Sequence, residues 1–351
     1  MGAIMQAKDK KIEVAQLWSM LNEYRLMDVR TPAEYNKGHI PQAGTLPLFN
    51  DGERIIVGTT YKKDSPKEAF LKGLDLVAPK MTSFIKDAEA FAPDKKLILH
   101  CWRGGRRSGS MAWLLDMAGF DVYAITGGYK AYRNFILQQF TKRPLQIVVL
   151  GGRTGCGKTH ILQALRAAGE QVLDLEGLAN HKGSAFGALG EAAQPSVEQF
   201  ENDMYEQFRH LDANRRVWVE NESRSIGRIY IPQGFWDQMR SSPLINLELS
   251  LELRVENLVS DYAQYSNEEL GAAFMRIRKR LGGLRFQQAI EALEAVDYHQ
   301  AAAIALAYYD KSYQYMLDNH SSPDIHNLPV DHNDPQRSAE LLINYCAQNQ
   351  L

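Results

Sequence analysis

The chain has 351 residues, of which 45% are hydrophobic and 23% are charged, and its net charge at pH 7 is −2. This composition is typical of a folded chain of two domains, and it excludes a polycation that binds nucleic acid through its overall charge. No apolar run in the sequence is long enough to cross a membrane, and the cysteine spacing suits neither a disulfide framework nor a zinc site. We therefore expect a cytoplasmic protein without membrane association and with three reduced thiols, at Cys101, Cys156 and Cys346.

The first 140 residues predict short helices that alternate with buried strands. A helix over residues 12–26 leads into a strand that ends at Asp28, and residues 50–53 predict a turn. Residues 66–91 are predicted to be mostly helical. The later elements of this half are a strand over residues 97–101, a strand over residues 119–124 and a helix over residues 129–140.

The most informative stretch of this half surrounds Cys101, which follows an apolar strand and precedes a helix that we expect to begin at Ser108. The loop between them points backbone N–H groups at one place, and the positive potential there lowers the pKa of a thiol. The other interpretation is a buried, inert cysteine in a strand-to-helix turn. We predict a nucleophilic Cys101 beside an anion-binding loop made of Trp102, Arg103, Gly104, Gly105, Arg106, Arg107 and Ser108.

Residues on both sides of this loop resemble the rhodanese family. The shared motifs are DVR at residues 28–30, GHIP at residues 38–41 and the glycine pair at residues 127–128. The resemblance covers about residues 10–140 and implies a rhodanese-like α/β fold. The spacing from Cys101 to Arg107 departs from that of ordinary sulfur-transferring members, because the loop is larger and can surround a phosphate-sized group.

The second half of the chain begins with a nucleotide-type phosphate-binding motif. Residues 141–144 predict a joint, which gives a rhodanese-like domain over residues 1–143 and a second domain over residues 144–351. A buried strand is predicted before the motif and a helix after it, as a P-loop requires. We predict that this loop binds a di- or triphosphate through Gly152, Gly155, Gly157, Lys158 and Thr159, where the lysine supplies charge and the threonine can bind Mg²⁺. The alternative is a glycine-rich turn that binds nothing.

Carboxylates follow later in this P-loop α/β domain. A polar loop over residues 176–187 follows a strand, and a helix is predicted over residues 196–214. The next strand ends at Glu220, with Glu222 nearby, which is typical of the metal side of a P-loop site. A strand end in solvent is the other interpretation, so no metal ligand is certain. From about residue 262 to residue 351 we predict mainly helices.

A basic stretch lies within this helical part. Residues 270–290 carry five basic side chains and no acidic one, although the chain as a whole is acidic. Such a stretch is either a solvated helix face or a patch that binds phosphate backbones. We predict that it contacts RNA through Arg276, Arg278, Lys279 and Arg280.

Taken together, the Cys101 loop, the P-loop and two further motifs resemble the tRNA 2-selenouridine synthase family. The further motifs are DLEGLANH at residues 174–181 and ENESR at residues 220–224. The resemblance spans nearly the whole chain and implies a transferase that acts on the wobble 2-thiouridine in the anticodon region of tRNA. It implies S-geranylation with geranyl diphosphate and then replacement of the geranylated sulfur by selenium from selenophosphate.

On this resemblance each loop serves one step. The P-loop would bind the diphosphate of geranyl diphosphate, with Mg²⁺ as its candidate cation. Cys101 and its loop would serve the selenophosphate step, and an enzyme that produces selenophosphate is a candidate partner. Two other functions stay open from the residues alone: a small-molecule kinase or NTPase with a regulatory rhodanese-like module, and a sulfurtransferase that passes a persulfide sulfur to an acceptor.

Overall fold

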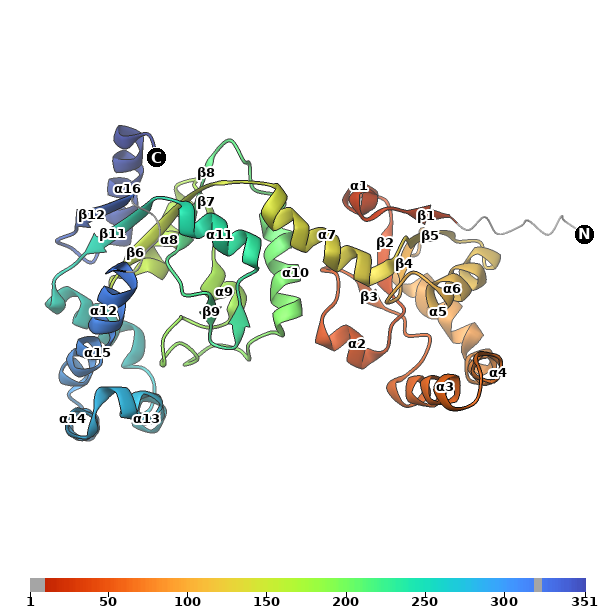
Figure 1. Ribbon diagram of the computed structural model, residues 1–351, viewed down its shortest axis with the longest axis horizontal. Helices are drawn as coiled ribbons and strands as arrows, with labels where there is room; N and C mark the ends of the chain where they lie inside the picture. Colours follow the sequence, from red (N-terminus) through yellow and green to blue (C-terminus); the bar gives the residue numbers. More distant parts are fainter. Residues whose placement is uncertain (1–9, 319–323) are drawn as a thin grey trace, which may run out of the picture. The chain divides into compact units, whose positions relative to one another are not determined.

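The computed structural model describes residues 10–318 and 324–351, which form two compact units (Figure 1). The first unit ends at Gln138 and the second begins at Gln139, so the division falls within helix α7 (Gly128–Lys142). Our predicted boundary between residues 143 and 144 lies just after the end of this helix.

The first unit is a five-stranded parallel sheet with helices around it. Strand β4 lies at its centre, and Leu97, Ile98 and Leu99 are fully buried because both faces of the sheet are covered. The strand order is β1-β5-β4-β2-β3, with bounds β1 (Lys11–Ile12), β2 (Arg25–Asp28), β3 (Gly44–Thr45), β4 (Lys96–His100) and β5 (Asp121–Ile125). The helices are α1 (Leu17–Met20), α2 (Pro32–Lys37), α3 (Asp51–Lys63), α4 (Pro66–Val77), α5 (Met81–Phe91) and α6 (Arg106–Met117).

Four local predictions were wrong. The helix predicted over residues 12–26 is only a 3-10 turn, Val14–Gln16, followed by α1, and Arg25 and Leu26 already belong to β2. Residues 50–53 are the start of α3 and not a turn, since the Asn50 side chain accepts from the Glu53 N–H at 2.8 Å. Helix α6 begins at Arg106 and not at Ser108, because the Ser108 hydroxyl bonds to Cys101 and does not cap the helix. The helix predicted over residues 196–214 ends at Phe208.

The second unit has a second parallel sheet, of order β12-β11-β6-β8-β7, which confirms the predicted α/β class. Its strands are β6 (Gln146–Gly152), β7 (Gln171–Leu173), β8 (Arg216–Glu220), β11 (Leu244–Glu248) and β12 (Ile325–Pro329), beside a small antiparallel pair, β9 (Ser225–Ile226) and β10 (Ile229–Tyr230). The β12 strand lies within the part that we predicted to be mainly helical, where it adds an edge strand to the sheet. Because β6 and β8 are neighbours, their carboxyl ends bring the P-loop and Glu220 to one edge.

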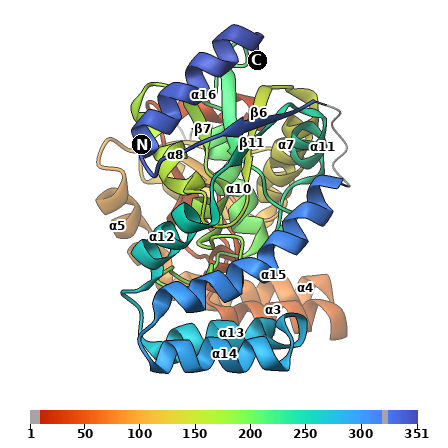
Figure 2. The same cartoon turned by 90° about the vertical axis from the view of Figure 1, so that its left-hand side faces the viewer.

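Some helices surround this sheet, and others form a separate layer beside it. The helices around the sheet are α8 (Lys158–Ala167), α9 (Leu175–Ala179), α10 (Val197–Phe208), α11 (Gln233–Ser241) and α16 (Pro335–Asn349). The layer consists of α12 (Leu251–Tyr262), α13 (Asn267–Leu281), α14 (Gly283–Glu294) and α15 (Tyr298–Asp318), and Figure 2 shows α13 and α14 side by side. In residues 10–318 and 324–351 no helix is long and apolar enough to cross a membrane.

The capping of α3 gives a stability prediction. Asn50→Ala removes the side-chain acceptor of the Glu53 N–H, so we expect the free energy of unfolding to fall by about 0.5–2 kcal/mol in urea denaturation followed by circular dichroism. Asn50→Asp keeps an acceptor and should stay close to the wild type. Equal stability of the Ala variant and the wild type would show that this helix does not depend on its cap.

Candidate functional site

The Cys101 thiol lies at the carboxyl end of β4, where it is 3% exposed. The Ser108 hydroxyl donates to its sulfur at 3.3 Å. Burial alone raises the pKa of the thiol, but hydrogen bonds from the hydroxyl and N–H of Ser108, and from two further loop N–H groups, outweigh burial and lower that pKa. This geometry favours the nucleophilic interpretation over an inert buried cysteine.

Glycines let the Cys101 loop pack tightly against the segment that follows β5. Gly104 has a φ of +62°, and a Cβ there would lie 2.5 Å from the Ile125 carbonyl oxygen. The same segment also holds the loop by hydrogen bonds, since the Tyr129 N–H donates to the Cys101 carbonyl and the Lys130 N–H donates to the Trp102 carbonyl, both at 2.9 Å. This one segment therefore fixes the loop, and the loop N–H groups are preorganised around the sulfur.

The three loop arginines differ in what they contact. The Arg107 guanidinium donates to both carboxylate oxygens of Glu34, at 2.5 and 3.0 Å, and so its terminal nitrogens are already paired. Arg103 is exposed, and the Arg106 guanidinium lies 5.6 Å from the centre of the Phe70 ring. Arg107 thus shapes the loop, whereas Arg103 and Arg106 are the arginines exposed to an incoming anion.

The P-loop has the conformation that its motif predicts. Gly155 and Gly157 have φ angles of +85° and +77°, and a Cβ on Gly155 would lie 2.7 Å from the Arg254 carbonyl oxygen. Helix α12 supports the loop, because Arg254 donates to the Thr154 carbonyl and Asn257 donates to the Gly155 carbonyl. The turn is held in place on one side by α12, and on the other side α8 begins at Lys158.

Two residues far away in sequence complete the first turn of this loop. The Tyr313 hydroxyl accepts from the Gly152 N–H at 2.6 Å and donates to the Asn246 side chain at 2.7 Å. Lys158 donates to the Gly152 carbonyl at 3.2 Å. Burial lowers the pKa of Lys158, but nearby acidic groups raise it overall, so the ammonium stays charged.

Three carboxyl groups gather beside Lys158 and Thr159. Glu220 is 1% exposed and accepts from the Glu176 N–H at 2.5 Å, which rules out a strand end in solvent. The Thr159 hydroxyl donates to Glu176 at 3.3 Å. Burial raises the pKa of Glu220, Glu176 and Glu222, and the last two share a hydrogen bond, so this pair holds a proton to higher pH than isolated carboxyls.

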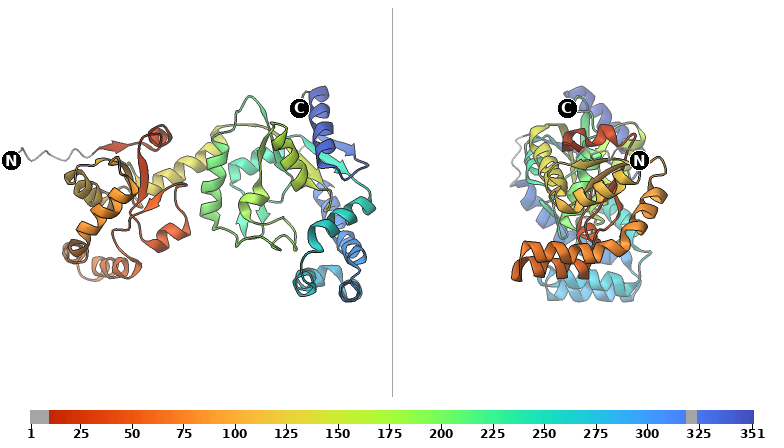
Figure 3. Two further views of the ribbon diagram at one scale, coloured as in Figure 1. Left: turned by 180° about the vertical axis from the view of Figure 1, so that it is seen from behind. Right: turned by 90° about the vertical axis from the view of Figure 1, so that its right-hand side faces the viewer.

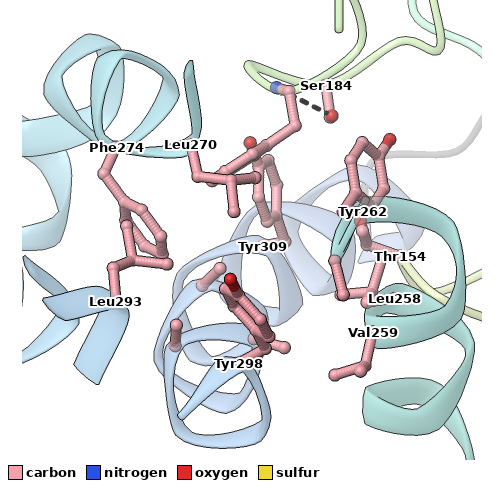
Figure 4. A pocket seen from close by; sticks show the side chains of 15 residues that line it. Thr154, Ser184, Leu258, Val259, Tyr262, Leu270, Phe274, Leu293, Tyr298 and Tyr309 are labelled. Atoms are coloured by element: carbon pink, nitrogen blue, oxygen red, sulfur yellow. Dashed lines mark hydrogen bonds between the residues drawn. The ribbon is translucent and has the colours of Figure 1, made fainter. Parts of the chain in front are cut away.

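A narrow apolar cavity opens beside the P-loop (Figure 4). It has about 530 Å³ of space free of protein atoms, its open mouth included. The walls come from α12 to α15, the loop before α10 and Thr154 of the P-loop, and they are lined mainly by Phe186, Leu258, Val259, Tyr262, Leu270, Phe274, Leu293, Tyr298, Ala301, Ala302, Ala305 and Tyr309. A site that joins a phosphate-binding loop to an apolar cavity suits a ligand with an anionic head and an apolar tail.

The loop before α10 covers both the cavity and the carboxyl groups. The Tyr309 hydroxyl accepts from the Ala185 N–H at 3.0 Å, which ties this loop to α15. Gly183 has a φ of +64°, and a Cβ there would lie 2.6 Å from a Glu222 oxygen. Glycine at this position therefore lets the backbone approach the carboxyl groups closely.

The predicted RNA-binding residues lie on one exposed stretch of α13, but three of them also have internal partners. The Arg278 guanidinium lies 5.2 Å from the centre of the Phe286 ring. Arg276 donates to the Ala185 carbonyl at 3.0 Å, and Arg280 donates to the Tyr308 hydroxyl at 3.3 Å. Arg278 and Lys279 are exposed in the last turn of the helix. Positive charge at a helix C-terminus is favourable in itself, so the patch has a structural role as well as a candidate binding role.

Sequence reasoning did not single out several residues of these sites. Glu34 lies between the DVR and GHIP motifs, and its partner Arg107 is 73 positions away. Tyr313 and Asn246 carried no local pattern that points to the P-loop. Glu176 lies in the polar loop over residues 176–187, and its position after a strand was the only sequence signal that pointed to it.

Family models match both halves of the chain. Residues 145–327 match the tRNA 2-selenouridine synthase AAA domain, and residues 13–135 match the rhodanese-like domain. The tRNA 2-selenouridine synthase of Sulfurovum sp. (strain NBC37-1) is 36% identical over 86% of this chain and 91% of its own length. The tRNA 2-selenouridine synthase of Hydrogenovibrio crunogenus is 34% identical over 85% of this chain and 90% of its own length.

The hydrogen bond from Ser108 predicts the reactivity of Cys101. Ser108→Ala removes a donor that stabilises the thiolate, so the pKa of Cys101 should rise and its alkylation by iodoacetamide at neutral pH should slow. Mass spectrometry of the Cys101 peptide over a pH series measures this. The matched control is Ser110→Ala, since the Ser110 hydroxyl donates to the Arg107 carbonyl and should leave the profile unchanged. Identical pH profiles for Ser108→Ala and the wild type would contradict the assignment.

Proposed function

Since this chain belongs to the tRNA 2-selenouridine synthase family, we propose that it is a tRNA-modifying transferase that exchanges the sulfur of wobble 2-thiouridine for selenium in two steps. In the first step the P-loop unit transfers a geranyl group from geranyl diphosphate to the sulfur. In the second step the unit with Cys101 uses selenophosphate to replace the alkylated sulfur.

The observation that carries the first step is the apolar cavity that shares Thr154 with the P-loop. A nucleotide would need polar partners for its base, whereas these walls are mostly aromatic rings, leucines and alanines. A prenyl chain needs only apolar contact, and its diphosphate needs the N–H groups and Lys158 of the adjoining loop. This match favours a prenyl diphosphate over the nucleotide of a kinase.

The chemistry of this step is a substitution at carbon. The thiocarbonyl sulfur of the base forms a bond to C1 of the geranyl group, and the C–O bond to diphosphate breaks with both electrons leaving on oxygen. The base loses its N3 proton. Charge therefore develops on the diphosphate, where Lys158 and the loop N–H groups stabilise it.

A divalent cation fits this arrangement. The Thr159 hydroxyl and a Glu176 oxygen lie 3.3 Å apart beside the phosphate loop, and hydroxyl and carboxylate oxygens are ligands that Mg²⁺ prefers. Thr159 and Glu176 would hold the ion, which would supply further positive charge next to the leaving diphosphate. The high pKa of the Glu176–Glu222 pair would fall on ion binding, since a cation favours the ionised carboxylates.

Alkylation prepares the base for the second step. A sulfide leaves C2 poorly, but an alkylated sulfur leaves as a neutral thiol once it takes up a proton. Selenium from selenophosphate bonds to C2, the C2–S bond breaks to release geranylthiol, and water takes the phosphoryl group as phosphate. The loop N–H groups around the Cys101 sulfur, together with the exposed Arg103 and Arg106, are suited to receive the selenophosphate anion.

The two other functions predict different activities. A kinase with a regulatory rhodanese-like module would bind and turn over ATP at the P-loop. A sulfurtransferase would carry a stable persulfide on Cys101 and pass sulfur to the base. Neither function explains an apolar cavity beside the phosphate loop.

Lys158→Ala separates the two steps. Loss of a charged hydrogen bond costs about 1.5–3 kcal/mol, so the KM for geranyl diphosphate should rise roughly tenfold to a hundredfold. Selenation of an anticodon stem-loop that is already geranylated should proceed at the wild-type rate, which is the internal control. Loss of ATP binding with geranyl transfer intact would support the kinase instead.

Filling the cavity tests the position of the prenyl chain. Ala302→Phe, on the cavity side of α15, should lower kcat/KM for geranyl diphosphate by about tenfold while transfer from the shorter dimethylallyl diphosphate persists. The matched control is Ala303→Phe, one residue further along α15 and outside the cavity lining. Unchanged use of geranyl diphosphate by the Ala302 variant would place the chain elsewhere.

The basic stretch of α13 gives a prediction about tRNA binding. Neutralising Arg278 and Lys279 to Gln should weaken binding and reduce the log–log salt slope by about 0.7–1 for each phosphate that the variant no longer binds. Affinities at several salt concentrations measure the slope, and a thermal melt of the same variant is the control. A lower melting temperature with an unchanged slope would assign these residues a structural role only.

A further inference from the structure

A second apolar surface lies in the first unit, beside the Cys101 loop. We name it the α3–α4 groove; its apolar walls are Phe49, Val57, Tyr61, Phe70, Leu74 and Val77, and its lining also includes residues 104–107 of the Cys101 loop and the start of α6. Its space free of protein atoms is about 1,870 Å³, the part open to solvent included. Figure 3 shows α3 and α4 side by side at one edge of this unit.

The large apolar side chains of this groove are left uncovered by the rest of the unit. Helix α4 buries only its small residues, Ala69 and Gly73, and leaves Phe70 and Leu74 51% and 48% exposed. On α3, Tyr61 is 59% exposed. Side chains four positions apart form one ridge of a helix, so the larger apolar ridge of α4 faces the groove. A contiguous apolar patch of this kind marks a binding site more often than a solvent face.

The groove is continuous with the anion-binding loop. Arg106 stacks over Phe70, so its guanidinium lies where the apolar wall meets the loop. A Cβ on Gly105 or Gly109 would meet no atom within 4 Å, which leaves the surface beside the loop open. The groove therefore offers apolar contact along α3 and α4, and glycines and arginines of the Cys101 segment at residues 104–107.

We propose that the α3–α4 groove binds the alkyl chain of the S-alkylated base while selenium replaces the sulfur. This inference rests on the proposed function, in which the second step begins from a geranylated base and releases geranylthiol. A ligand for this site must place its reacting carbon near the Cys101 loop and an apolar chain beside it. The groove has the apolar walls for such a chain and lies beside that loop. It would also distinguish an alkylated base from unmodified 2-thiouridine, which has no alkyl chain to bind there.

The experiment compares two modified anticodon stem-loops in single-turnover selenation. One carries S-geranyl-2-thiouridine and the other carries S-methyl-2-thiouridine, each given with selenophosphate. We expect the wild type to use the geranylated substrate about tenfold or more better, because burial of the longer chain contributes to binding. Leu74→Glu and, independently, Tyr61→Glu should reduce this preference and leave the S-methyl reaction unchanged.

The matched control is Leu71→Glu. Leu71 is next to Phe70 on α4 and 45% exposed, close to the exposure of Leu74, but it does not line the groove. It should keep the wild-type preference. Thermal melts of all three variants verify that they are folded.

Two results would overturn the inference. In one, Leu74→Glu and Tyr61→Glu keep the full preference for the geranylated substrate. In the other, both variants lose the two reactions equally, which would show that the groove does not act on the alkyl chain. A wild type that makes no selenouridine from the geranylated stem-loop would instead refute the proposed function itself.

Discussion

On the proposed function, both units of this chain depend on the same constraint, which is that an anion must meet several backbone N–H groups at once. A strand followed by a tight loop and a helix satisfies it, and both tight loops require residues with left-handed φ angles, at Gly104 and at Gly155 and Gly157. The two loops differ in the functional groups that lie next to them. In the first unit that neighbour is a thiol with a lowered pKa, and in the second it is a lysine among carboxyl groups.

The two units share a second feature, which is an apolar surface next to the loop that we propose binds an anion. A cavity adjoins the P-loop, and a groove adjoins the Cys101 loop. On the proposed function, the enzyme makes an alkylated base in one step and consumes it in the next, so it must accommodate the alkyl group twice. The two surfaces differ in kind, since the first is narrow and the second is wide and open, as expected if one selects a small donor and the other receives a nucleoside.

Local pattern predicted the strands β4 and β6, both loops and the order of most helices, because these depend on residues close together in sequence. It failed where a distant or specific partner decides the structure. Asn50 caps a helix that looked like a turn, and Arg107 is paired with Glu34 rather than open to an anion. The cavity was not predicted, because its walls come from four helices and two loops whose apolar residues look like ordinary core. The β12 strand buries only Leu328 and pairs only with β11, so its residues carry little pattern of a buried strand.

The division of labour between the two loops is the central claim, and Cys101→Ser tests it most directly. The purified variant is given tRNA with wobble 2-thiouridine and geranyl diphosphate, then selenophosphate, and the nucleosides are measured by mass spectrometry. Our account predicts S-geranyl-2-thiouridine at the wild-type rate and no selenouridine after selenophosphate is added. Selenouridine at the wild-type rate, or loss of geranylation in a normally folded variant, would contradict it.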